Sequence, residues 1–156
     1  MRSFFTGITI YPVFLQKIKY LGRIICLDYG KVRTGIAVTD EMQLIASGLT
    51  TVLTTELLSF LKKYLSEEKV TSFVVGEPKQ MNNTPSESEA LIGPFIQVLK
   101  QTFPEIPVYR QDERFTSQMA VKSMIASGMK KKQRRRKEMV DEISATLILQ
   151  AFLNKV

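Results

Sequence analysis

The sequence contains no histidine and only one cysteine in 156 residues. Without histidine the chain lacks the most common general base, the catalytic triads that depend on it and imidazole-bound zinc. Any catalysis must therefore use carboxylates, lysine, hydroxyl groups or a metal ion. One thiol cannot form an intrachain disulfide, and Cys26 lies within an apolar run. We expect Cys26 to be a small buried residue of a protein in the reducing cytoplasm.

Long hydrophobic segments are also missing. A helix that crosses a bilayer needs about 20 consecutive apolar residues, and Lys17, Arg23 and Asp28 interrupt the hydrophobic N-terminal third. The apolar stretch 4–15 has no small-residue cleavage site before the first predicted strand, so it does not fit a signal peptide. We expect no membrane association, and we expect residues 1–21 to be an extension, either disordered or the product of a misassigned start codon.

The rest of the chain, residues 22–156, is long enough for one hydrophobic core and too short for two ordinary domains. The formal net charge is +7, and one segment of seven basic residues accounts for all of it. These residues are Lys130, Lys131, Lys132, Arg134, Arg135, Arg136 and Lys137. A solvated loop would explain such a run, but its position just before a predicted helix with an acidic residue favours contact with the phosphates of a polyanion.

Hydrophobic periodicity predicts the order of the secondary-structure elements. Three apolar runs, 23–27, 35–38 and 49–53, predict sequential antiparallel strands. The later pattern predicts, in order, a helix at 54–68, a strand at 73–75, a loop at 79–86, a helix at 91–99, a strand at 106–109 and helices at 116–128 and 138–153. Pro94 predicts a kink or a later start in the second helix. This order is typical of an α/β domain with a mixed five-stranded sheet, in which three antiparallel strands precede strands that alternate with helices.

Acidic residues fall where predicted strands end. Asp28 follows four apolar residues at the end of the first strand, and the pair 112–113 follows the last strand. These two strands run parallel in the predicted topology, so their ends meet at the edge of the sheet where ligands gather. Asp141 shares a helix face with apolar residues four and seven positions later, so its side chain is expected to lean toward the sheet.

Carboxylates that converge on one point repel each other unless a cation or a proton lies between them. Oxygen ligands alone suit Mg²⁺ or Mn²⁺, and such ions activate water for phosphodiester cleavage. Each acid also has a simpler interpretation: Asp28 as a turn residue, the pair 112–113 in ion pairs with neighbouring arginines, and Asp141 as a partner of the helix dipole. The constellation favours metal binding over these separate roles.

Several stretches of the chain, in this order, resemble one protein family. They are LDYG at 27–30, RTGIAVTD at 33–40, VVG at 74–76 before Pro78, DERFTS at 112–117, and DEISA at 141–145 followed by LILQ at 147–150. The family is YqgF, described as pre-16S ribosomal RNA nucleases and as Holliday-junction resolvase-like proteins. The resemblance extends over roughly residues 22–153, and it is specific because the motifs occur together.

The resemblance implies a ribonuclease-H-like fold and metal-binding acids in the first strand, in the Asp-Glu-Arg segment and in the last helix. Carried to this chain, the catalytic and metal-binding residues are Asp28, Glu113 and Asp141. Strand alternation lets only one of two adjacent acids face the site; we expect Glu113 to do so, with Asp112 as the alternative. The chain departs from the family pattern at Glu77, where an apolar residue is expected. Glu77 is therefore either a fourth ligand or a surface residue.

The function that this reading favours is a metal-dependent nuclease that processes precursor 16S ribosomal RNA, free or in pre-ribosomal particles. We expect substrate phosphates to contact Lys31, Arg33 and Arg114 as well as the basic run. A resolvase that cuts four-way DNA junctions would use the same chemistry, and an obligate two-fold dimer would favour it. The sequence does not choose between a monomer and a dimer.

Two functions of other classes are also compatible with parts of the sequence. A non-catalytic RNA-binding ribosome-assembly factor would tolerate Asp28→Asn without loss of cellular function, whereas the nuclease would not. An actin-like ATP-binding module also opens with a strand that carries an aspartate and a glycine turn. A chain of this length lacks the second lobe that would close over the nucleotide.

Overall fold

The computed structural model describes residues 21–155, so the predicted extension at 1–21 lies outside the described residues except for Leu21. The elements are β1 (Arg23–Tyr29), β2 (Arg33–Thr39), β3 (Ala46–Leu53), the short 3₁₀ helix η1 (Thr54–Glu56), α2 (Leu57–Glu67), β4 (Val70–Glu77), α3 (Glu89–Thr102), β5 (Val108–Asp112), α4 (Thr116–Ala126), α5 (Lys131–Arg134) and α6 (Lys137–Leu153). Within 21–155, no helix has the length and apolar character required to cross a bilayer.

The strands form one mixed sheet in the order β3-β2-β1-β4-β5. Strands β1, β2 and β3 pair antiparallel, while β4 runs parallel to β1 and β5 runs parallel to β4. The predicted five-stranded mixed sheet is therefore confirmed. Because β1, β4 and β5 are parallel, their carboxyl ends meet at one edge, where the chain places its acidic residues.

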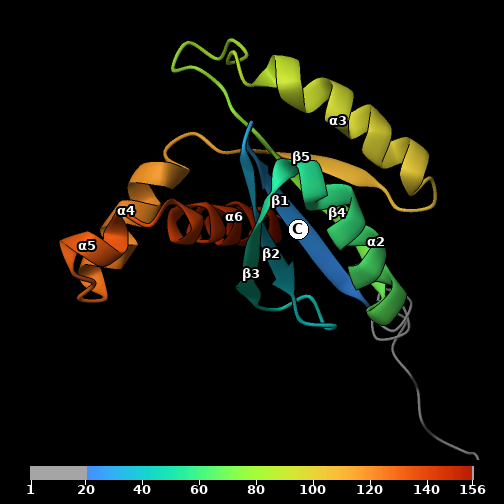
Figure 1. Cartoon of the computed structure of the whole chain (residues 1–156), viewed down its shortest axis with the longest axis horizontal. Helices are drawn as coiled ribbons and strands as arrows, with labels where there is room; N and C mark the ends of the chain where they lie inside the picture. The colour runs from blue at the N-terminus through green and yellow to red at the C-terminus, as the bar shows by residue number, and fades with distance from the viewer. Residues whose placement is uncertain (1–20, 156) are drawn as a thin grey trace, which may run out of the picture.

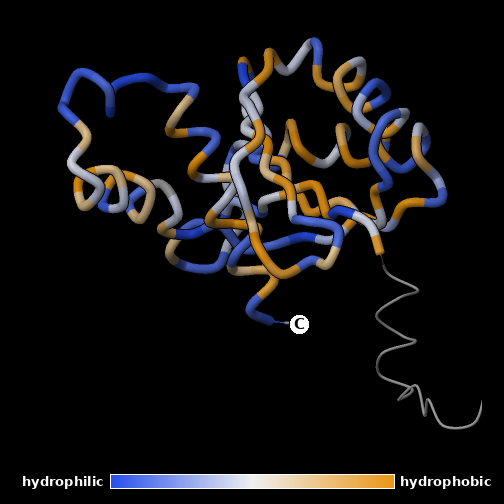
Figure 2. Tube along the Cα trace, turned by 90° about the horizontal axis from the view of Figure 1, so that it is seen from below, coloured by the Kyte–Doolittle hydropathy of each residue, from blue (hydrophilic) through white to orange (hydrophobic). Residues whose placement is uncertain are grey.

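Helices cover both faces of the sheet, with α6 on one face and α2 and α3 on the other (Figure 1). Alternate residues of β1 divide between the two layers: Ile25 and Leu27 pack toward α2 and α3, whereas Ile24 and Cys26 pack toward α6. Hydrophobic residues are concentrated along the strands between the helices (Figure 2). Full burial of one such side chain contributes about 1.5–3 kcal/mol relative to exposure. Cys26 is fully buried, as predicted.

Two glycines let α6 lie close to the sheet. A Cβ atom on Gly35 of β2 would overlap the backbone of Asp141, and one on Gly48 of β3 would overlap the side chain of Glu142. The hydroxyl of Thr51 donates a hydrogen bond of 2.6 Å to the carbonyl of Glu138 in the first turn of α6. These contacts fix the N-terminal half of α6, and with it Asp141, against β2 and β3.

The structure corrects several predicted boundaries. Strand β3 begins at Ala46 rather than at 49. Ser47 and Gly48 do not break the strand, because they pair with β2 beside a register irregularity. Strand β5 begins and ends later than predicted, since its pairing with β4 continues to Asp112 opposite Glu77. The acid at position 112 therefore belongs to the strand and does not follow it.

Helix α3 begins at Glu89 and contains Pro94, so the expected later start is wrong. Proline removes one i→i−4 hydrogen bond, and the burial of Ile92, Phe95 and Leu99 beside it holds the helix in place. Helix α4 is followed by Gly128 with a φ of 78°, the predicted stop. The basic run includes the short helix α5, which hydrophobic periodicity could not reveal because its residues are charged and mostly exposed.

Candidate functional site

Asp28 and Glu113 form a pair of partly buried carboxyl groups at the carboxyl edge of the sheet. Asp28 follows Ile24 and Cys26 on the α6 face of β1, and Glu113 lies directly after β5. A hydrogen bond joins the two side chains. Burial raises the pKa of both groups; the charge of Asp141 raises that of Asp28 further, and the charge of Asp28 raises that of Glu113 further. Without a cation, the pair therefore holds a proton well above the usual carboxyl pKa.

Gly76 of β4 provides the space for this pair. A Cβ atom at position 76 would overlap the carboxylate of Glu113. Because β4 lies between β1 and β5, a larger residue there would push Glu113 away from Asp28. The glycine in the VVG motif is therefore part of the site, and this role was not apparent from the sequence.

The third predicted acid, Asp141, is close enough to act electrostatically on Asp28 but is engaged elsewhere. Its Oδ2 atom lies 3.3 Å from Nε of Arg33, at the start of β2. Among residues 21–155, no three acidic, cysteine or histidine side chains have the mutual spacing of a metal site. The structure thus brings Asp28 and Glu113 together and places Asp141 in an ion pair beside them.

The chemistry of this donor set fits a divalent metal ion. The site offers only oxygen donors from partly buried carboxylates, whose pKa values are raised first by burial and then by the charge of a neighbouring carboxylate. Asp28 and Glu113 would hold the ion, and Asp141 would join them on leaving Arg33.

The alternative ligands Asp112 and Glu77 lie on the opposite, α2–α3 face. The parallel register places Asp112 beside Glu77, and alternation along β4 puts Glu77 on the face opposite Gly76. Asp112 accepts two hydrogen bonds from Nε of Arg114, and this partner holds the pKa of Asp112 below its usual range. Oε2 of Glu77 lies 3.3 Å from Nζ of Lys79. Both acids therefore have cationic partners, and neither faces Asp28.

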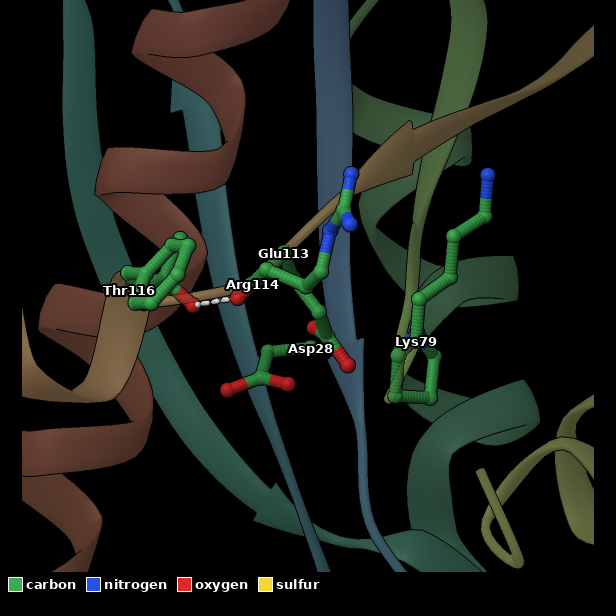
Figure 3. A pocket seen from close by; sticks show the side chains of 7 residues that line it. Asp28, Lys79, Glu113, Arg114 and Thr116 are labelled. Atoms are coloured by element: carbon green, nitrogen blue, oxygen red, sulfur yellow. Dashed lines mark hydrogen bonds between the residues drawn. The ribbon is translucent and has the colours of Figure 1, made fainter. Parts of the chain in front are cut away.

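The carboxylate pair opens into a cavity of about 270 Å³. Its lining consists of Asp28, Glu113, Pro78, Lys79, Arg114, Phe115 and Thr116 (Figure 3). The hydroxyl of Thr116 donates a hydrogen bond of 2.7 Å to the carbonyl of Glu113, and the backbone N–H of Thr116 donates to the same oxygen at 3.1 Å. Thr116 therefore fixes the backbone of the acid that the site needs.

Sequence reasoning missed four residues of this lining: Pro78, Lys79, Phe115 and Thr116. Their positions in the chain could have indicated them. Pro78 and Lys79 follow β4 at the carboxyl edge, and Phe115 and Thr116 come two and three residues after Glu113. Ligands of α/β sheets gather at that edge, so the neighbours of each acid were candidates as well as the acid itself.

The predicted phosphate-binding residues differ in their availability. Lys31 is exposed in the turn between β1 and β2, but Arg33 is paired with Asp141. Arg114 is held by Asp112, and it also donates a hydrogen bond of 2.5 Å to Oδ1 of Asn83 in the loop after β4. The side chain of Arg114 is therefore less available to a phosphate than predicted.

The basic run lies on α5 and at the start of α6, the helix that carries Asp141. Helices α4 and α5 extend from the sheet beside the N-terminal end of α6 (Figure 1). Of its seven cations, only Arg134 is half-buried, and within 21–155 none of them forms an ion pair. These side chains are available to a polyanion.

A sequence model of the family described as "RuvX: Holliday junction resolvase" matches residues 22–155 of the chain. A protein of Christiangramia forsetii is 59% identical over 133 residues, which cover 85% of this chain and 98% of the relative. A protein of Flavobacterium johnsoniae is 56% identical over 132 residues, covering 85% and 96%. Both relatives are named "Putative pre-16S rRNA nuclease".

Among solved structures, RuvC of T. thermophilus in complex with a Holliday junction substrate is similar to this chain. The TM-score is 0.53 at 14% sequence identity, and the match covers 86% of this chain and 96% of the RuvC chain. At this identity the likeness concerns the fold alone, and it confirms the ribonuclease-H-like architecture predicted from the sequence.

Proposed function

The chain belongs to the RuvX family of Holliday junction resolvases, and we propose that it is a nuclease that hydrolyses phosphodiester bonds of structured nucleic acid with the help of a divalent metal ion. One observation carries the proposal: two partly buried carboxyl groups, Asp28 and Glu113, are hydrogen-bonded to each other at the edge of a ribonuclease-H-like sheet and line an open cavity. A purely structural pair of acids would be expected to have a cationic partner.

In this mechanism Asp28 and Glu113 would give up the proton of their hydrogen bond and would hold the ion, for which Mg²⁺ and Mn²⁺ are the expected species. The bound metal supplies Lewis-acid stabilisation of the phosphate charge and lowers the pKa of water. Thr116 keeps Glu113 in position through the hydrogen bond to its carbonyl. Lys79, on the wall of the cavity, and the basic run before α6 attract the phosphates on either side of the cleaved bond.

We infer that the substrate is precursor 16S ribosomal RNA, alone or within pre-ribosomal particles, and that the enzyme works in the cytoplasm. The names of relatives that match 85% of this chain at 56–59% identity support this substrate. The exposed cations of the basic run suit a long RNA, because several phosphates can be contacted at once.

A second candidate substrate is a four-way DNA junction, which the description of the family favours. The carboxylate chemistry would be the same for DNA and RNA. A resolvase must make two symmetric cuts, so this candidate requires a two-fold dimer on the junction.

The test is cleavage by the purified protein, in Mg²⁺ or Mn²⁺, of end-labelled precursor 16S RNA fragments and of a four-way DNA junction. Glu113→Gln is expected to abolish cutting. Glu105→Gln is the matched control, because Glu105 is exposed between α3 and β5, away from the cavity. RNA cutting that only Glu113→Gln removes would establish the ribonuclease, and preferred junction cutting would establish the resolvase. Metal-independent binding without cutting of either substrate would contradict the proposal and favour an assembly factor.

A further inference from the structure

Phe115 connects β5 to α4 and lines the cavity beside Glu113. Its side chain is 53% exposed, although phenylalanine is usually buried. Its backbone has φ 70° and ψ −4°, in the left-handed region. A bulky residue rarely adopts this conformation, because the Cβ atom crowds the following carbonyl. The chain therefore keeps an exposed aromatic ring at a strained position next to the carboxylate pair.

Folding requirements do not account for this residue. Phe115 occupies the N-cap position of α4, where a serine, threonine, asparagine or aspartate normally accepts a hydrogen bond from the helix. Its side chain makes no capping hydrogen bond. The ring belongs to neither of the two buried core clusters. Glycine at this position would remove the backbone strain, and a short polar residue would cap the helix.

The surroundings of Phe115 suit a nucleotide. The cavity combines an aromatic side chain with the carboxylates of Asp28 and Glu113 and with the cationic Lys79. A nucleotide could contact all of these side chains. Its base would stack on the aromatic ring, and its phosphate would face the catalytic acids and the cations. A base inside a duplex is already stacked on both sides, so only an unpaired base could take this place.

We propose that Phe115 is a positioning residue, which stacks on an unpaired RNA base beside the cleaved phosphate and so directs the enzyme to cleavage sites with an unpaired nucleotide. The inference rests on the proposed nuclease function and narrows its substrate class. It also gives the strained backbone a role, because the left-handed turn holds the ring at the mouth of the cavity instead of in the core.

The test measures binding without turnover, in the Asp28→Asn background and in Mg²⁺. The probes are an RNA hairpin with a single-stranded extension, carrying 2-aminopurine at each unpaired position in turn, and the same hairpin with a blunt end. Phe115→Gly is expected to weaken binding of the extended hairpin about tenfold or more, since stacking of one base corresponds to roughly a 5- to 150-fold change in affinity. Binding of the blunt hairpin should not change.

Three further readouts separate stacking from a structural role. The 2-aminopurine fluorescence should respond at one unpaired position with Phe115, should respond there again with Phe115→Trp, and should not respond with Phe115→Gly. Phe115→Gly should also raise the melting temperature, because glycine relieves the left-handed strain. Ile125→Ala is the matched control: Ile125 lies in α4, the helix that Phe115 precedes, with the same 53% exposure and outside the cavity lining, and its loss should leave RNA binding unchanged.

Equal affinity of Phe115→Gly and its parent for the extended hairpin would overturn the inference, as would a fluorescence response that survives this substitution. The nuclease proposal fails separately, when the wild-type chain binds the extended hairpin through Phe115 but cuts no RNA. Conversely, a wild-type enzyme that cuts RNA with a KM unaffected by Phe115→Gly would keep the nuclease proposal and reject the stacking role.

Discussion

The acidic residues at the carboxyl edge of the sheet have different partners on its two faces. On the α2–α3 face three acids have cationic partners: Glu89 pairs with Arg110, Asp112 with Arg114 and Glu77 with Lys79. On the α6 face, Asp28 and Glu113 are hydrogen-bonded to each other, and within residues 21–155 neither forms an ion pair. The first arrangement stabilises the fold, whereas the second is the arrangement we propose to bind a divalent cation.

The contrast extends to the pKa values. Arginine partners hold the pKa values of Glu89 and Asp112 below their usual range. Burial and mutual repulsion raise those of Asp28 and Glu113. Asp112 and Glu113 differ in this way because strand alternation turns adjacent residues to opposite faces of the sheet.

The largest expected effect comes from the same substitution made on both faces. Asp28→Asn should reduce metal-dependent cleavage by about a factor of 10³ or more, because it removes a metal ligand. Asp112→Asn should keep cleavage within roughly tenfold and should cost about 1 kcal/mol of unfolding free energy, since Arg114 loses its charged partner. Initial cleavage rates and denaturant melts measure the two effects. Equal loss of cleavage in both variants would show that the two faces are not functionally distinct.

The next effect concerns Glu89, which accepts two hydrogen bonds from Arg110 on the α2–α3 face. Arg110 donates hydrogen bonds of 2.7 and 2.9 Å to Glu89 and one of 3.0 Å to the carbonyl of Gly76. Glu89→Gln should lower the unfolding free energy by about 1–3 kcal/mol, because it leaves a partly buried guanidinium without its carboxylate. Urea denaturation measures this change, and cleavage should remain within a few fold of wild type. An unchanged stability would contradict a structural role for this face.

A third prediction is the pH dependence of stability without metal. A folded-state pKa above the unfolded value means that the folded protein binds more protons than the unfolded chain, so stability falls as pH rises. Asp28 and Glu113 should therefore make the chelator-treated protein lose several degrees of melting temperature as pH rises from about 5 into the neutral range. Thermal melts in a pH series check this, and Glu113→Gln should flatten the curve. A melting temperature that rises over this pH range, and that no longer rises in Glu113→Gln, would contradict an uncompensated negative charge at the carboxylate pair.

The smallest expected effect concerns Arg33, which forms an ion pair with Asp141 on the α6 face. If the ion pair with Asp141 competes with metal binding, Arg33→Gln should raise the affinity for Mn²⁺ by a few fold. Lys31→Gln, in the same turn but exposed, is the control and should leave the affinity unchanged. Calorimetric titration measures both. A lower affinity in Arg33→Gln would mean that Arg33 positions Asp141 for the metal instead of competing for it.

Much of this arrangement was accessible from the sequence. The strand order and the parallel β1, β4 and β5 followed from periodicity and crossover rules, and they placed Asp28 and position 113 at one edge. Alternation allowed only one of the adjacent acids at 112 and 113 to face Asp28, and the family resemblance favoured Glu113, which is the acid hydrogen-bonded to Asp28. These features depend on local pattern and chain direction, which the sequence records directly.

Other features depend on contacts between segments that are distant in sequence. The ion pair between Arg33 and Asp141 bridges 108 positions, and the space that Gly76 leaves for Glu113 exists only once β4 lies between β1 and β5. The left-handed turn at Phe115 opposes the intrinsic preference of that residue, so no propensity rule predicts it. The continuous helix through Pro94 reflects tertiary burial that outweighs a local penalty.

The most direct test of the account is a Mn²⁺ titration at neutral pH that records bound metal and released protons together, for the wild-type chain, Glu113→Gln and Asp112→Asn. The account predicts one bound ion per chain with release of about one proton, since the carboxyl pair must give up its shared proton to the metal. Glu113→Gln should lose this binding, and Asp112→Asn should retain it. Mn²⁺ binding of equal strength in Glu113→Gln, or binding that only Asp112→Asn removes, would contradict the assignment of the α6 face as the metal site.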